Sequence, residues 1–240
     1  MPKERRARRR SEGRVRRHYL VAGLLAVVVV IGAAVWWATR APEQSLEAGK
    51  PVILYVNQGN GAVNRTNFQA MVAFAKAQGF NTVFFQVYRE GVLLFSLQDL
   101  EAFVSEAHAQ NLSIFFALYF TNSSQEIPTT VLQAGEDGVS LDMSTLSLAN
   151  QTSLLSTLKS EYGGKTAVTT YDMPSSLRPD ILVYETYSAD QRSFITKGVI
   201  GSVEVHGLTE SQYQSQFSYA LQNSDGVMVF DYAGLLKSGY

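Results

Sequence analysis

Asp137-Gly138-Val139-Ser140-Leu141-Asp142 combines a turn signal, a short apolar run and an acid at the point where a strand should end. Similar phrases recur at Tyr184-Glu185, at Val203-Glu204-Val205-His206 and at residues 225–231. Segments with the helical spacing of apolar residues lie between them. Buried strands that alternate with helices and carry polar groups at their carboxyl ends are typical of a (β/α)8 barrel, whose chemistry lies at that end. The sequence therefore predicts an α/β fold, a compact TIM-type (β/α)8 barrel.

Eight strands are predicted between residues 51 and 240. They cover residues 51–57, 82–88, 112–120, 139–143, 166–171, 181–186, 199–205 and 227–232. The predicted helices cover residues 66–78, 97–110, 148–162, 189–197 and 209–223, with a short helical piece at 130–134. The strands are near-continuous apolar runs, as expected when both faces of a sheet are covered. The link between the fifth and sixth strands is too short for a crossover helix, so we expect a tight turn around residues 175–178.

The first 50 residues differ in character from the rest. Residues 1–18 carry nine Lys and Arg, and the run from Tyr19 to Ala38 is almost wholly apolar. At about 1.5 Å rise per residue, 20 helical residues cover the roughly 30 Å hydrocarbon core of a bilayer. We predict a basic cytoplasmic tail at 1–18, one transmembrane signal anchor at 19–38, a linker at 39–50 and an extracellular domain at 51–240. The positive-inside rule puts the N-terminus in the cytoplasm, which makes this a single-pass protein of the cell membrane.

A cleaved signal peptide is the alternative interpretation of this segment. The length of the apolar run and the lack of a clean Ala-x-Ala cleavage site after it favour a retained anchor. The basic tail has two interpretations as well, a topology determinant or a binder of anionic lipid or nucleic acid. We favour the topology determinant.

Charge and cysteine content exclude several function classes. Residues 1–40 carry ten Lys and Arg against two Glu, whereas the remaining 200 residues carry ten against nineteen Asp and Glu. A nucleic-acid-binding domain is not expected, since phosphate contacts need a basic surface. The chain has no cysteine, which excludes disulfides, thiolate metal sites and cysteine nucleophiles.

Polar residues occupy the predicted carboxyl ends of all eight strands. The candidate catalytic residues are the acids Asp142, Glu185, Glu204 and Asp231. The candidate substrate-binding residues are the other polar and aromatic residues there: Asn57, Gln86, Tyr88, Arg89, Tyr119, Asp172, Tyr187, His206 and Tyr232. Strand alternation puts Asp142 on the face of Ser140, and we expect that face to point to the barrel axis. By the same alternation Asp231 shares a face with Val229.

These acids suit the cleavage of glycosidic bonds. That reaction needs one protonated carboxyl as general acid and one ionised carboxyl as base or nucleophile. Burial or a neighbouring carboxylate provides the raised pKa that the acid requires. Acids at barrel ends also cap helices and brace loops, so each of these residues has a structural alternative. No cofactor is predicted. His206 follows Glu204 at the spacing of a metal pair, but no third ligand is suitably placed, so we expect a hydrogen-bonded histidine and no metal.

Two stretches resemble known barrel families. Residues 134–142 (Ala-Gly-Glu-Asp-Gly-Val-Ser-Leu-Asp) and residues 179–185 (Pro-Asp-Ile-Leu-Val-Tyr-Glu) are similar to acid-bearing strands of endo-α-1,4-polygalactosaminidase and spherulin-4-like barrels. Residues 79–88 resemble an early strand of uncharacterised glycosyl-hydrolase-like barrels. The resemblance covers roughly half the chain. It implies a (β/α)8 fold, extracellular work on polysaccharide, and Asp142 with Glu185 as the catalytic pair.

The sequence as a whole predicts a membrane-anchored, extracellular, glycoside-hydrolase-like protein that acts on a poly- or oligosaccharide through a pair of carboxylates. Two alternatives stay open. One is a non-catalytic carbohydrate-binding or surface-scaffold barrel, which fits the small size and short loops. The other is an accessory subunit of a membrane complex, which would carry a sizeable exposed apolar patch.

Overall fold

The computed structural model describes residues 49–59, 63–122, 124–171, 177–185 and 195–239. All of them belong to one compact unit that spans Glu47–Tyr240. The predicted tail, anchor and most of the linker lie outside the described residues, so they stay predictions. In the ranges just given, no helix combines the length and apolar character that a membrane span requires.

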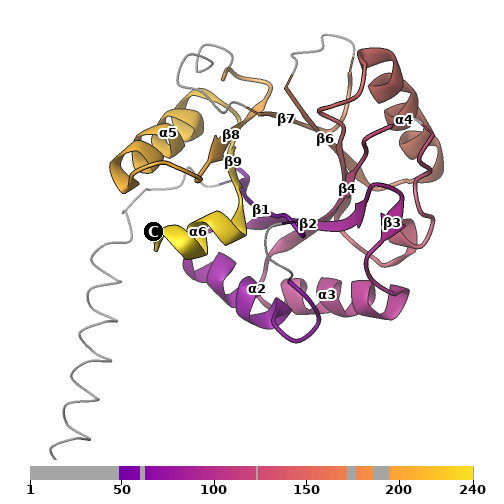
Figure 1. Ribbon diagram of the computed structural model, residues 1–240, viewed down its shortest axis with the longest axis horizontal. Coiled ribbons are helices and arrows are strands. Elements are labelled where there is room, and N and C mark those ends of the chain that lie inside the picture. Colours follow the sequence, from indigo (N-terminus) through magenta and orange to yellow (C-terminus); the bar gives the residue numbers. More distant parts are fainter. Residues whose placement is uncertain (1–48, 60–62, 123, 172–176, 186–194, 240) are drawn as a thin grey trace, which may run out of the picture. The chain divides into compact units, whose positions relative to one another are not determined.

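Eight parallel strands close into a barrel, which confirms the predicted TIM-type fold (Figure 1). Around the barrel they are β1 (Val52–Val56), β2 (Thr82–Arg89), β4 (Ser113–Tyr119), β5 (Gly138–Asp142), β6 (Lys165–Thr170), β7 (Ile181–Tyr184), β8 (Ile200–Glu204) and β9 (Val227–Phe230). The last strand pairs with the first, with Ile53 opposite Met228. Strands β6 and β7 are parallel neighbours despite the short link between them.

Helices cover the outside of the ring of strands (Figure 1). They are α2 (Phe68–Ala77), α3 (Leu97–Ala109), α4 (Leu148–Glu161), α5 (Glu210–Asn223) and α6 (Tyr232–Ser238), with a 3-10 turn at Val131–Gln133. Local sequence explains where two of them begin. Ser96 and Asp99 form a reciprocal capping box at the start of α3, and Thr209 and Gln212 form another at the start of α5.

The predicted helices at 66–78, 97–110, 148–162 and 209–223 are confirmed to within two residues at each end. The predicted helix at 189–197 lies mostly outside the described residues, and so does the first half of the turn at 175–178. Two elements are additional to the prediction. Helix α6 follows the last strand, and β3 (Val92–Leu93) forms a hairpin with the end of β2. Both are short, and the hairpin turn uses Glu90 and Gly91 at positive φ.

Alternation along the strands separates an inner core from an outer core. Inward side chains, among them Tyr55, Phe84, Phe115 and Met228, pack on the barrel axis. The rings of Phe84 and Phe115 stack with centroids 5.1 Å apart. Gly138 of β5 is the register partner of Phe115, and a side chain there would meet that ring. The Phe115 ring thus occupies the space that a side chain at position 138 would need, and glycine at that position leaves room for it.

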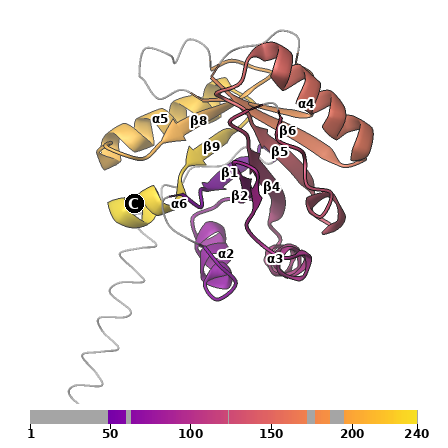
Figure 2. The same ribbon diagram turned by 45° about the vertical axis from the view of Figure 1, so that its right-hand side comes forward.

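Outward side chains of the strands pack against the helices. Phe85 of β2 contacts Phe103 of α3 edge-on, with ring centroids 5.0 Å apart. Phe68 of α2 lies 4.3 Å from the same ring, between centroids. Helices α2 and α3 lie side by side in both views (Figures 1 and 2). This aromatic cluster anchors two helices on one strand, and each fully buried ring contributes about 2–3 kcal/mol by its removal from water.

We expect the substitution Gly138→Ala to lower the free energy of unfolding by about 1–3 kcal/mol. The new Cβ would collide with Cε1 of Phe115, so the buried ring must move. Urea unfolding of the purified chain measures the change. Gly163→Ala is the matched control, because a Cβ there has nothing within 4 Å. Equal stability of the Gly138 variant and the parent chain would contradict this account of the inner core.

Candidate functional site

Two buried acids lie at the carboxyl ends of β5 and β7. Asp142 ends β5 and is 7% exposed, and Glu185 directly follows β7 and is 2% exposed. Glu185 shares the inward face of Val183, which belongs to the inner core. Thr169 of β6 is the register partner of both Asp142 and Val183. Glu185 therefore stands two strands from Asp142, a lateral offset of about 10 Å at about 4.8 Å per strand, and two residues further toward the carboxyl ends of the strands.

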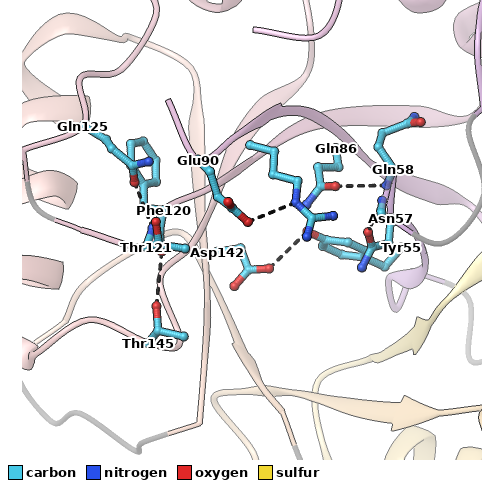
Figure 3. Close-up of polar contacts among 12 residues, drawn as sticks. Tyr55, Asn57, Gln58, Gln86, Glu90, Phe120, Thr121, Gln125, Asp142 and Thr145 are labelled. Carbon is cyan, nitrogen blue, oxygen red and sulfur yellow. Dashed lines mark hydrogen bonds and ion pairs between the residues drawn. The ribbon is translucent and has the colours of Figure 1, made fainter. Parts of the chain in front are cut away.

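Both carboxylate oxygens of Asp142 accept hydrogen bonds. The Tyr55 hydroxyl of β1 donates to Oδ2 at 3.1 Å, across the barrel interior (Figure 3). The Ser144 hydroxyl donates to Oδ1 at 3.2 Å. The Tyr55 ring is held by Phe230, with centroids 5.2 Å apart. Asp142 is therefore oriented from two sides, and its inward position matches the face that it shares with Ser140.

Burial and hydrogen bonding act on Asp142 in opposite directions. Burial raises the pKa of Asp142 to about 6, while the hydrogen bonds from Tyr55 and Ser144 lower it. Burial, followed by the negative charges of Asp142 and Glu185, raises the pKa of Tyr55 well above its usual value. Tyr55 is therefore a neutral donor throughout the physiological range, and Asp142 changes its charge close to neutral pH.

Tyr119 and Arg89 border the two acids on the side of β2 and β4. Tyr119 is the register partner of Asp142, and burial followed by the charge of Asp142 raises the pKa of its phenol. The Arg89 guanidinium lies 5.8 Å from the centroid of the Tyr119 ring, and its Nε donates to Glu90 at 3.2 Å. Asn57, on the inward face of β1, accepts a hydrogen bond from the Gly59 N–H at 2.6 Å. A phenol and a half-exposed cation thus border the acid pair, and the Asn57 amide lies beside Gly59 just after β1.

Glu204 also lies on the inward face, in the same strand as the buried Ser202. Burial raises the pKa of Glu204, the nearby His206 lowers it, and Asp231 raises it. Glu204 is partly exposed, in contrast to Asp142 and Glu185. The three inward acids therefore comprise two buried carboxyls and one that reaches solvent.

Asp231 differs from the other acids, because its carboxylate caps the start of α6. It follows β9, which ends at Phe230. Asp231 is fully buried, accepts the Gly234 N–H at 2.8 Å as the N-cap of α6, and lies 3.0 Å from Nε2 of His206. Its contacts, like those of His206, join strand ends to the last helix.

Two aromatic residues expected at the barrel mouth lie in the outer core instead. A β-bulge between Gln86 and Tyr88 reverses the alternation of β2, so Tyr88 turns outward and packs on Phe120 with ring centroids 5.3 Å apart. Tyr232 begins α6 and packs edge-on against Phe74 of α2, with centroids 5.3 Å apart. Neither ring lies beside the acid pair.

Gln86 does face the interior, but it is 2% exposed and its side chain accepts the Gln58 N–H at 2.9 Å. It therefore supports other residues rather than presenting itself to solvent. Asp172 and Tyr187 lie outside the described residues. Among the residues that the structure does describe, no group of three or more His, Asp and Glu is arranged to hold a metal ion.

Sequence reasoning missed Tyr55 and Ser144 as parts of the site. Tyr55 stands two residues before Asn57, on the same inward face, and that spacing was a usable signal. A tyrosine within a Val- and Leu-rich strand, however, looks like ordinary core. Ser144 follows the end of β5 and carries no pattern that separates it from other loop serines.

The sequence matches no protein-family model and no curated protein. Many solved structures share the fold. The xylanase and alpha-amylase inhibitor protein XAIP-II from Scadoxus multiflorus has a TM-score of 0.58 and 12% identity, over 80% of this chain and 96% of that one. The maltogenic alpha-amylase AmyB from Thermotoga neapolitana has a TM-score of 0.50 and 11% identity, over 76% of this chain and 67% of that one.

CpGH84B has a TM-score of 0.50 and 7% identity, over 75% of this chain and 44% of that one, so this chain spans less than half of its length. At such identities the likeness shows the barrel fold alone.

We expect Asp142→Asn to raise the free energy of unfolding above pH 6 by on the order of 2 kcal/mol, because the ionised carboxylate is buried at a cost. The pKa of Asp142 is about 6 in the folded chain, against 3.8 for an ordinary aspartate. The parent chain therefore loses stability as the pH rises from about 4 to 6, whereas asparagine has no charge to bury. Urea unfolding at several pH values between 4 and 8 measures both curves. A difference that stays constant over this range would contradict the assignment.

Proposed function

We propose that this protein is a glycoside-hydrolase-like barrel that cleaves O-glycosidic bonds in a poly- or oligosaccharide, with Asp142 and Glu185 as its carboxyl pair. The single observation that carries the proposal is the burial of these two acids on the inward face, at the barrel end where TIM-barrel chemistry occurs. Two carboxyl groups that flank one bond are the requirement of this reaction.

The surroundings of Asp142 suit the ionised member of the pair. Both of its oxygens accept hydrogen bonds from hydroxyl groups, an arrangement that stabilises a carboxylate. At neutral pH, above its pKa of about 6, Asp142 carries its charge. Glu185 then supplies the proton to the departing sugar oxygen. Glu204 is on the same inward face and partly exposed, so its role is to contact substrate rather than to serve as the general acid or the ionised carboxylate.

Groups beside the pair suit the binding of a sugar. Tyr119 offers a ring and a hydroxyl next to Asp142, and Arg89 and Asn57 offer hydrogen-bond donors at the same end of the barrel. Aromatic faces and a few polar groups are the usual means by which proteins orient a small polar ligand. Names of fold relatives that refer to amylase and xylanase add support at the level of analogy only.

A non-catalytic carbohydrate-binding or protein-binding barrel is the second candidate. Its specific support is the likeness to XAIP-II, which extends over 96% of a protein that is named as an inhibitor of xylanase and alpha-amylase. In that case the acids would contribute to recognition, and glycan binding would occur without release of new chain ends.

We expect Asp142→Asn and Glu185→Gln each to lower kcat/KM by at least about 100-fold on any polysaccharide that the parent chain cleaves. Release of reducing ends from a panel of cell-surface and environmental polysaccharides provides the measurement. Glu101→Gln is the matched control, since Glu101 is an exposed acid on α3, outside the barrel mouth. Cleavage that survives in both variants would rule out this pair. Glycan binding without cleavage in the parent chain would favour the second candidate.

The proposal also places the barrel outside the cell, tethered by residues 19–38. Its support is the apolar run from Tyr19 to Ala38 behind nine Lys and Arg. We expect the full chain to stay in the membrane pellet after carbonate extraction and to be digested by protease added to intact cells. A variant without residues 19–38 should be recovered in the soluble fraction. Release of the parent chain by carbonate, or a mature N-terminus after residue 38, would indicate a cleaved signal instead.

A further inference from the structure

Two hydrogen bonds lie between the β1–α2 connection and Asp142, and neither the sequence nor the proposed reaction accounts for them. The Gln58 N–H donates to Gln86, and the Tyr55 hydroxyl donates to Asp142, with Gln86 and Tyr55 near each other in Figure 3. We propose that Tyr55 is a positioning residue that keeps the Asp142 carboxylate an ionised acceptor. The inference deepens the proposed function and rests on it for its purpose, but the contacts stand independently.

The orientation of the Gln86 carboxamide is determined by the backbone of Gln58. The backbone N–H of Gln58 can only donate, and it donates to Oε1 of Gln86 at 2.9 Å. The carboxamide of Gln86 is thereby oriented with its oxygen toward the loop. Its NH2 group is left free to face Tyr55, and Gln86 opposes, as the smallest of the causes, the burial that raises the pKa of that phenol. An amide orientation that is usually ambiguous is here set by a backbone donor.

Tyr55 provides the contact with the acid itself. Its hydroxyl donates to Oδ2 of Asp142 at 3.1 Å. The phenol stays protonated, because burial raises its pKa well above the usual value. Tyr55 cannot turn elsewhere, since its side chain is fully buried and packed on Phe230. Oδ2 of Asp142 therefore faces the hydroxyl of a tyrosine that is held in place by its surroundings.

Gln58 is itself held in place by the loop. The Gln58 side chain donates to the Val63 carbonyl at 3.0 Å and accepts the Val63 N–H at 3.1 Å. These two bonds fasten Gln58 where the chain enters α2. The position of the Gln58 N–H, and through it the orientation of Gln86, is thus set by the two bonds between the Gln58 side chain and the backbone of Val63.

Hydrogen bonds, not cations, stabilise the charge of Asp142. The groups that lower its pKa are the Tyr55 hydroxyl and the hydroxyl and N–H of Ser144, and no basic side chain of the described chain joins them. The nearest other ionisable side chain is Tyr119 of β4, whose pKa the charge of Asp142 raises. Three more ionisable groups act on the same phenol: Glu185 after β7, and Arg89 and Glu90 at the end of β2.

The test is the titration of Asp142, read from the 13C resonance of its carboxyl carbon in the full-length chain. Aspartate labelled at that carbon reports each residue, and loss of one signal in Asp142→Asn assigns it. We expect a midpoint near 6 in the parent chain. In Tyr55→Phe the midpoint should rise by about 1 pH unit, a tenfold change in proton affinity, because the donor is lost and the ring is kept.

Two further variants make the test decisive. Tyr213→Phe, which removes a buried phenol on α5, is the matched control and should leave the midpoint unchanged. Gln86→Met should also raise the midpoint, but by less than Tyr55→Phe. The hydroxyl that donates to Asp142 is kept in this variant, and only the amide beside it is lost. An unchanged midpoint in a folded Tyr55→Phe would overturn the proposal. If that variant does not fold, an unchanged midpoint in Gln86→Met overturns it instead.

The outcome is separable from that of the proposed reaction. The titration needs no substrate, so a shifted midpoint supports the role of Tyr55 even if Asp142→Asn leaves cleavage intact. Where cleavage is found, the acidic limb of the pH profile of kcat/KM should move upward in Tyr55→Phe by the same interval as the titration. A purely structural role of the tyrosine would reduce the amount of folded protein and leave that limb in place.

Discussion

The pairing of β9 with β1 is the constraint on which the rest of the structure depends. It turns eight strands into a closed ring, so that no barrel strand is left at an edge and alternate side chains must point to one axis. Residues far apart in the sequence then share a small interior. Tyr55 and Asp142 are separated by 87 positions and lie within hydrogen-bond distance. Without closure, β1 would have no reason to face β5.

The interior that closure creates is divided along its axis. Rings and aliphatic side chains such as Phe84, Phe115 and Met228 fill one part of it, and they supply stability through burial. Toward the carboxyl ends of the strands the same inward face carries Asp142 and Glu185, both buried and both acidic. Burying such groups costs stability even when hydrogen bonds compensate part of the cost. We propose that the barrel retains them at this end for a chemical use, and this cost is the physical basis of the functional proposal.

The barrel by itself does not specify a reaction, since the same architecture serves many unrelated chemistries. The likeness to an inhibitor protein and to an amylase illustrates this, because one barrel shape accompanies both names. What distinguishes one barrel from another is the set of groups at the carboxyl ends of the strands. Here that set is an acid pair, the Tyr55 hydroxyl that donates to one of the acids, and the Arg89 guanidinium over the Tyr119 ring. The argument for function therefore depends on these residues and on their contacts.

Local sequence patterns determined the elements of this protein. The capping pair Ser96 and Asp99, the apolar spacing of α2 and the short buried strands each act over a few residues, so they can be seen without knowledge of the fold. The same holds for the acids at the ends of β5 and β7. Only the tertiary structure decided which way several side chains face. The bulge after Gln86 turns Tyr88 outward, and the carboxylate of Asp231 caps the start of α6. The bulge depends on how β2 pairs with β4, and the position of Asp231 depends on where α6 begins. The hydrogen bond from Tyr55 to Asp142 depends on closure of the barrel. Register and closure arise from contacts between distant segments, which local patterns do not contain.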